Sequence, residues 1–103
     1  MDFLRELGIQ ETNSGAYCGE WLETSGELLE SRSPATGELQ ATVKQATAEE
    51  YDQVVAAAEE AFLRWREVPA PIRGEIIRKM GNAIREKKDA LGRLITAEMG
   101  KIL

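Results

Sequence analysis

The fold of this chain is decided by residues 69–103, whose sequence is PAPIRGEIIRKMGNAIREKKDALGRLITAEMGKIL. Apolar side chains recur there at steps of three and four residues, which is the spacing of one face of an α-helix. Lys87 and Lys88 interrupt the apolar stripe, where burial of two ammonium groups would be costly. We therefore expect two helices separated by a break at these lysines, with Asp89 capping the second and Gly100 closing it.

A further amphipathic helix is expected immediately upstream. It begins at a capping box, Thr47-Ala-Glu-Glu50, in which the threonine accepts from a free backbone N–H and the glutamate reaches back. Pro69 and Pro71 end this helix and begin the next. The apolar stripes of the two helices consist of Tyr51, Val54, Val55, Ala58, Ala61, Phe62 and Trp65, and of Ile72, Ile76, Ile77, Met80 and Ile84.

Residues 1–46 show a different pattern, a short helix followed by short strands and turns. The expected elements are a helix over 2–9 that stops at Gly8, a turn at 13–15, strands at 21–24, 27–32 and 38–46, and turns at 25–26 and 33–37. The predicted fold class is therefore α+β, a short antiparallel hairpin or strands beside two to three amphipathic helices, divided into residues 1–46 and a helical segment over 47–103.

These elements lack the central parallel sheet that such helices normally cover. Five side chains are expected to need a partner surface outside the chain: Ile76, Ile77, Ile84, Leu91 and Leu94. We therefore expect the isolated chain to be marginally stable or to self-associate.

Composition excludes several classes of function. The formal net charge of −5 provides no basic face for nucleic acid, and no apolar run is long enough to cross a membrane. The chain has no histidine, which excludes Ser-His-Asp and Cys-His arrangements and histidine-ligated zinc within it. A single cysteine and an acidic N-terminus without a signal-peptide pattern favour a cytoplasmic location.

No residue of this chain is expected to be catalytic, to bind a cofactor or to ligate a metal. Cys18 has no base or cation beside it in sequence, so a turn cysteine is favoured over a nucleophile. No G-x-G-x-x-G occurs, and Glu98-Met-Gly-Lys101 lacks the remaining residues of a phosphate-binding loop. The acidic pairs Glu49/Glu50 and Glu59/Glu60 are expected on solvated helix faces.

Motifs along the whole chain nevertheless resemble one family, the aldehyde dehydrogenases. The motifs general to that family are Ser33-Pro-Ala-Thr-Gly-Glu38, the set Ala57, Ala61, Phe62 and Trp65, Arg73-Gly74, and Glu98-x-Gly-Lys101. A narrower resemblance, to the α-aminoadipic semialdehyde dehydrogenase (antiquitin) subfamily, rests on Phe3-Leu-Arg-Glu-Leu-Gly8, Gly15-Ala-Tyr17, Gly19-Glu-Trp21, Pro69-Ala-Pro71, Arg73-Gly-Glu-Ile76, Leu91-Gly92 and Glu98-Met-Gly-Lys-Ile-Leu103.

The resemblance implies a parent enzyme that oxidises a semialdehyde to the carboxylate with NAD or NADP, in lysine catabolism, as a homo-oligomer (dimer or tetramer). A cysteine in such enzymes forms a thiohemiacetal, hydride passes to the cofactor, a glutamate activates water and an asparagine contributes to the oxyanion site. These groups and the substrate-anchoring acid lie downstream of the matched region, so the chain alone is expected to be inactive. Some members bind a structural cation through a backbone carbonyl near the position of Arg32, although no side chain here signals it.

The resemblance also implies that this region is the N-terminal part of the cofactor-binding domain, within a Rossmann-like α/β fold, and helps to shape the substrate entrance. Two alternatives stay open. The chain could be a non-catalytic helical interaction module whose isoleucine stripe is its binding face, or it could belong to another aldehyde dehydrogenase subfamily.

Overall fold

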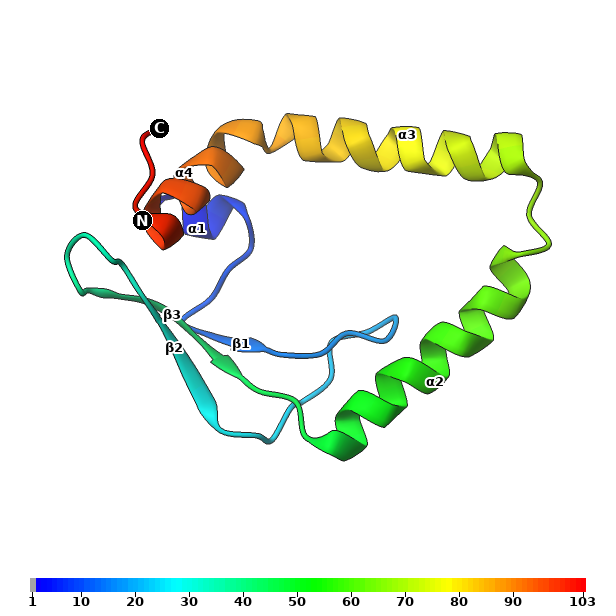
Figure 1. Cartoon of the computed structure of the whole chain (residues 1–103), viewed down its shortest axis with the longest axis horizontal. Helices are drawn as coiled ribbons and strands as arrows, with labels where there is room; N and C mark the ends of the chain where they lie inside the picture. The colour runs from blue at the N-terminus through cyan, green and yellow to red at the C-terminus, as the bar shows by residue number, and fades with distance from the viewer. Residues whose placement is uncertain (1) are drawn as a thin grey trace.

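The computed structural model describes residues 2–103 as a mixed α+β fold, which confirms the predicted class. The elements follow the order α1 (Asp2–Glu6), β1 (Thr12–Ser14), β2 (Leu28–Arg32), β3 (Leu39–Lys44), α2 (Ala48–Trp65), α3 (Ala70–Glu86) and α4 (Lys88–Met99). In Figure 1 the sheet lies at one end with α1 and α4 beside it, while α3 and α2 form an arch that leads away from it.

The three strands form one sheet of order β1-β3-β2. β2 and β3 are the predicted antiparallel hairpin, with Leu29 opposite Val43, but β1 joins the other side of β3 in parallel, with Asn13 opposite Val43. The prediction of a turn at 13–15 was therefore wrong. Residues 13 and 14 belong to β1, which is extended and pairs with β3 about 30 positions later in the chain. The strand expected at 21–24 was also wrong. Only an isolated bridge from Tyr17 to Trp21 forms there, within the loop that joins β1 to β2.

The hairpin turn is formed by residues 33–37, as predicted. The N–H of Gly37 donates to the carbonyl of Ser33 at 2.8 Å, and the N–H of Ser33 donates to the carbonyl of Glu38 at 2.9 Å. Gly37 has φ of 77°, a conformation that strains residues with a Cβ and therefore suits glycine at this position.

The boundaries of α2, α3 and α4 follow the predicted signals except at one residue, whereas α1 ends at Glu6 and is shorter than the helix predicted over 2–9. The capping box of α2 is present, α3 ends at the expected break, and Gly100 closes α4 with φ of 70°. The prediction that Asp89 caps α4 was wrong, because Lys87 is the N-cap residue and no side chain accepts there. Asp89 instead lies in the first turn of α4, where the positive end of the helix dipole stabilises its negative charge.

The first helix and the last pack together above the sheet. α1 contacts α4, and the amide Nε2 of Gln40 on β3 donates to the carbonyl of Ala97 on α4 at 3.0 Å. Ser31 on β2 donates to the carboxylate of Glu98 on α4. These contacts fix α4 against the sheet. The break at Lys87 is therefore the point at which α3, on its N-terminal side, diverges from the sheet (Figure 1).

The resulting molecule is open. Its radius of gyration is 16.7 Å, whereas a compact chain of this length would have about 13 Å. Its accessible surface is 8217 Å², against roughly 5,800 Å² expected for a compact protein of its mass. Within residues 2–103 the buried apolar residues are Ala16 and Ala90, and no large side chain is fully enclosed. The chain therefore exposes roughly 2,400 Å² more surface than a compact protein of the same mass would expose.

Candidate functional site: an exposed apolar face on α2 and α3

An exposed apolar surface follows the predicted stripe of α2. Phe62 is 55% exposed, and Tyr51 and Val55 are also exposed although their helical spacing places them on one face. Among residues 2–103, no other helix or strand packs extensively on α2. Within this part of the chain, the predicted stripe of α2 is therefore left without a helix or strand to cover it.

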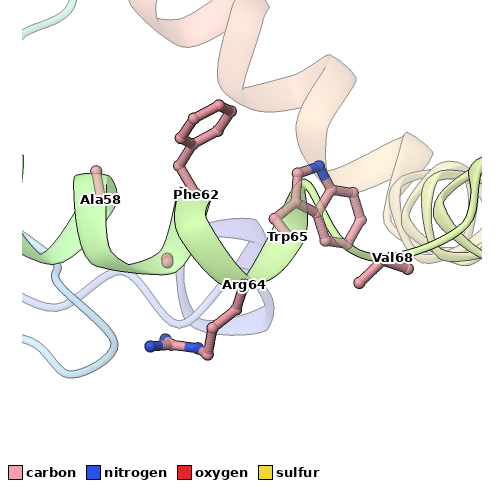
Figure 2. A pocket seen from close by; sticks show the side chains of 6 residues that line it. Ala58, Phe62, Arg64, Trp65 and Val68 are labelled. Carbon is pink, nitrogen blue, oxygen red and sulfur yellow. The ribbon is translucent and has the colours of Figure 1, made fainter.

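A shallow apolar groove of about 550 Å³ lies at the end of this face. Figure 2 shows Phe62 and Arg64 leaving α2 on opposite sides, with Trp65 and Val68 at the point where the chain turns toward α3. The guanidinium of Arg66 lies 5.9 Å from the centre of the Phe62 ring, a cation–π contact at the edge of the groove. The groove is lined by Ala58, Ala61, Phe62, Arg64, Trp65 and Val68.

The stripe of α3 is exposed in the same way. Ile77, Met80 and Ile84 are all more than half exposed, and Ile76 is 37% exposed. The predicted need of the isoleucine stripe for a partner surface is thus matched by its exposure. Leu91 and Leu94 on α4, which were grouped with it, are half-buried instead, because α4 packs on α1 and near the sheet.

α2 is held in its direction by bonds at its first turn. The hydroxyl of Thr47 accepts from the N–H of Glu50 at 3.2 Å, and the carboxylate of Glu50 accepts from the N–H of Thr47 at 2.8 Å. The same carboxylate accepts from the N–H of Ser25 at 3.2 Å, on the loop before β2. These bonds, first of all the one from the Thr47 backbone, hold the pKa of Glu50 below its ordinary value. The predicted capping role of Glu50 is confirmed, and the same carboxylate also ties α2 to the loop before β2.

The loop that receives Glu50 is itself packed tightly on the end of β3. Thr24 is buried, and its hydroxyl donates to the carbonyl of Lys44 at 2.6 Å. The N–H of Gly26 donates to the carbonyl of Gln45 at 2.8 Å, and a Cβ at Gly26 would collide with that carbonyl. The direction of α2 relative to the sheet is thus set by residues 24–26, which pack on the end of β3, and by Glu50, which bonds to them.

Cys18 lies half-buried in the tight loop between β1 and β2. Its N–H donates to the carbonyl of Glu20 at 3.0 Å, and the Tyr17 and Trp21 rings meet edge to face beside it, with centroids 5.0 Å apart. Arg32, at the position implied for a structural cation, is a β2 residue whose guanidinium pairs with Glu30 at 2.6 Å. Residues 2–103 contain no cluster of three or more potential metal ligands. That none of these residues is catalytic stays a prediction.

The chemistry of the exposed face is therefore that of protein association. Contiguous apolar side chains on neighbouring helices typically mark a surface that another folded body covers. Among residues 2–103, no helix is both long enough and apolar enough to span a bilayer. Sequence reasoning found the stripes from their periodicity, whereas the Glu50–Ser25 connection depends on a tertiary contact between residues 25 positions apart and left no signal in the pattern.

The sequence of this chain is similar to that of known proteins. Residues 21–103 match the model of the aldehyde dehydrogenase family. The chain is 46% identical over 101 residues to α-aminoadipic semialdehyde dehydrogenase of Mus musculus, covering 98% of this chain and 19% of the mouse protein. It is 45% identical over 104 residues to aldehyde dehydrogenase family 7 member A1 of Pisum sativum, covering 100% of this chain and 20% of the pea protein.

The match extends to aldehyde dehydrogenase family 7 member B4 of Arabidopsis thaliana, at 45% identity over 103 residues, or 99% of this chain and 20% of that protein. The chain thus spans about a fifth of the length of the curated relatives it matches. The family model covers most of the sequence, and the chain belongs to the aldehyde dehydrogenase family.

Proposed function

We propose that this chain is the N-terminal part of the cofactor-binding domain of an NAD(P)-dependent aldehyde dehydrogenase, with residues 1–46 as its short helix and strands and 47–103 as its helical segment. The observation that carries the proposal is the apolar face of α2 and α3, exposed on a chain that is about 45% identical to such enzymes over its whole length. The remainder of the same subunit would cover that face.

The role proposed for the chain is structural. Residues 2–103 do not fit a dinucleotide by themselves, because no glycine-rich turn joins a strand to the start of α2, α3 or α4. What the chain supplies is a rigid arch, anchored to the sheet by Glu50 and by the α4 contacts, on which a larger domain assembles. By itself the chain is not expected to oxidise aldehydes.

The substrate proposed for the whole enzyme is a semialdehyde of the α-aminoadipic type, oxidised to the carboxylate in lysine catabolism. Support comes from the relatives in Mus musculus and Bos taurus, both named α-aminoadipic semialdehyde dehydrogenase. We further propose that the whole enzyme is a cytoplasmic homo-oligomer, a dimer or tetramer, with an aldehyde and NAD or NADP as its small-molecule partners.

A chimera tests the structural role. Residues 1–103 replace the aligned first fifth of the mouse relative, and reduction of NAD and of NADP by α-aminoadipic semialdehyde is followed by absorbance. The proposal expects a soluble, active chimera, and expects neither the chain alone nor the mouse protein without its first fifth to be active. A folded chimera with no activity, or aldehyde oxidation by the chain alone, would refute it.

The substrate needs a different experiment, because the chimera inherits its substrate site from the mouse protein. The full-length polypeptide that carries this chain is assayed side by side with α-aminoadipic semialdehyde and a simple aliphatic aldehyde. Preference for the semialdehyde in kcat/KM supports the proposed subfamily, and preference for the aliphatic aldehyde places the enzyme in another one.

A non-catalytic interaction module is the second candidate, and the same exposed isoleucine stripe favours it. The chimera distinguishes the two candidate functions, because a free-standing interaction module is not expected to restore activity to a truncated enzyme. In that case the chimera would be inactive, and the chain would instead form a stoichiometric complex with a protein that is not a dehydrogenase.

A further inference from the structure

Arg73 occupies an unusual position on α3, inside its apolar stripe. Ile76, Ile77 and Met80 follow it at intervals of three, four and seven residues, which in an α-helix places all four side chains on one face. The remaining arginines of α3 have partners on the same helix. Arg78 pairs with Glu75 at 2.5 Å, and Arg85 donates to the side-chain oxygen of Asn82 at 2.9 Å.

The guanidinium of Arg73 has no such partner among residues 2–103. It forms no ion pair with any of their carboxylates, and its Nε is shut off from solvent without an acceptor in reach. The side chain is half-buried, although the isoleucines around it are exposed. An arginine guanidinium is always positively charged, so the energetic cost of burying it cannot be reduced by loss of a proton.

Covering this face with a purely apolar surface would remove water from an unpaired cation. Such burial is strongly unfavourable unless the charge gains a partner with good hydrogen-bond geometry. A carboxylate matches the planar fork of a guanidinium with two parallel hydrogen bonds, which makes it the fitting acceptor. The chemistry of the covering surface is thereby specified at one point: an acid set among apolar side chains.

We propose that an aspartate or glutamate outside residues 1–103, in the remainder of the same subunit, pairs with the guanidinium of Arg73 when α3 is covered. The inference rests on the proposed function, because it takes the rest of an aldehyde dehydrogenase subunit as the occupant of this face. It adds a specific contact that orients α3 on that body, beyond the apolar burial that attaches it.

The experiment uses the chimera with the mouse relative, carrying Arg73→Lys, and a carbodiimide that joins an amine to a carboxylate in direct contact. Mass spectrometry then locates the carboxylate bonded to position 73. The matched control is Arg78→Lys, for which the cross-link should join position 78 to Glu75 of the same helix. The proposal expects position 73 to be joined to one acidic residue beyond the segment contributed by this chain.

Three results would overturn the inference while leaving the proposed function intact. The first is an active Arg73→Lys chimera with no cross-link at position 73. The second and third are a cross-link from position 73 to an acidic residue within residues 1–103, either of another copy or of the same copy. If the substituted chimera does not assemble, the structure of the unsubstituted chimera gives the answer. A carboxylate oxygen within salt-bridge distance of the Arg73 guanidinium supports the pairing, and its absence overturns it. Failure of the unsubstituted chimera to assemble would count against the proposed function itself.

Discussion

The effect of Phe62→Ala should depend strongly on whether the exposed face is covered. Phe62 is 55% exposed in this chain, so less than half of its surface is removed from water. Complete burial of such a side chain stabilises a protein by about 1.5–3 kcal/mol, and a cation–π contact at an exposed site adds about 0.5–1 kcal/mol. In the isolated chain, loss of the partly covered ring and of its contact with Arg66 should therefore destabilise α2 by about 1–2 kcal/mol.

In the chimera the same substitution should cost about 3–5 kcal/mol, because it removes a fully covered ring and leaves a cavity. The matched control is Leu63→Ala, which lies outside the predicted stripe, about 100° around α2 from Phe62, and is 49% exposed; its cost should be nearly the same in both proteins. The assay is native-state hydrogen exchange, which gives the opening free energy of the α2 amides in the chain alone and in the chimera. Equal costs for Phe62→Ala in the two contexts would refute the claim that α2 is a docking face.

Three further predictions concern how α2 is anchored in the isolated chain. Thr47→Ala should destabilise it by about 1 kcal/mol through loss of the N-cap, measured by urea titration, and an unchanged midpoint would contradict the capping box seen at Thr47. Hydrogen bonds, first of all the one from the Thr47 backbone, hold the pKa of Glu50 below the ordinary value of a glutamate, so its contribution to stability is present above that ordinary value and is lost as the pH falls through the lowered pKa. Glu50→Gln should therefore flatten the acid limb of the urea midpoint against pH, and parallel curves for the two proteins would show that Glu50 is not linked to folding. Gly26→Ala should lower the midpoint because its Cβ would meet the Gln45 carbonyl, and a neutral effect would mean that the loop can move aside.

The elements predicted correctly from sequence are those whose signals are local. The capping box spans four residues, the Lys87–Lys88 pair interrupts a stripe directly, and glycine at position 100 suits a left-handed helix end. Each depends on the conformational or solvation preference of one or two side chains, which is largely independent of the rest of the fold.

The elements missed depend on partners distant in sequence. Thr12 to Ser14 form a strand because β3 offers its edge about 30 residues later, and nothing in their own pattern favours extension. Residues 21–24 alternate like a strand, yet Thr24 donates its hydroxyl to the Lys44 carbonyl instead of joining the ladder. The role of Glu50 and the unpaired state of Arg73 likewise became visible only in three dimensions.

The apolar stripes illustrate both cases. Their periodicity predicted amphipathic helices correctly, because apolar residues at helical spacing must face a common surface. Periodicity alone does not show where that surface lies, since a stripe has the same spacing whether its partner belongs to the same chain segment or to another. The expectation of a partner surface outside the chain came instead from the missing parallel sheet.

Side-chain accessibility of the α2–α3 face, measured by hydroxyl-radical footprinting, tests the central claim most directly. Phe62, Trp65 and Met80 are followed in the chain alone and in the chimera, with the exposed Tyr51 recorded alongside them. We predict rapid oxidation of all three in the chain alone and strong protection of all three in the chimera. Equal oxidation in the two proteins would contradict the claim that the rest of an aldehyde dehydrogenase subunit covers this face.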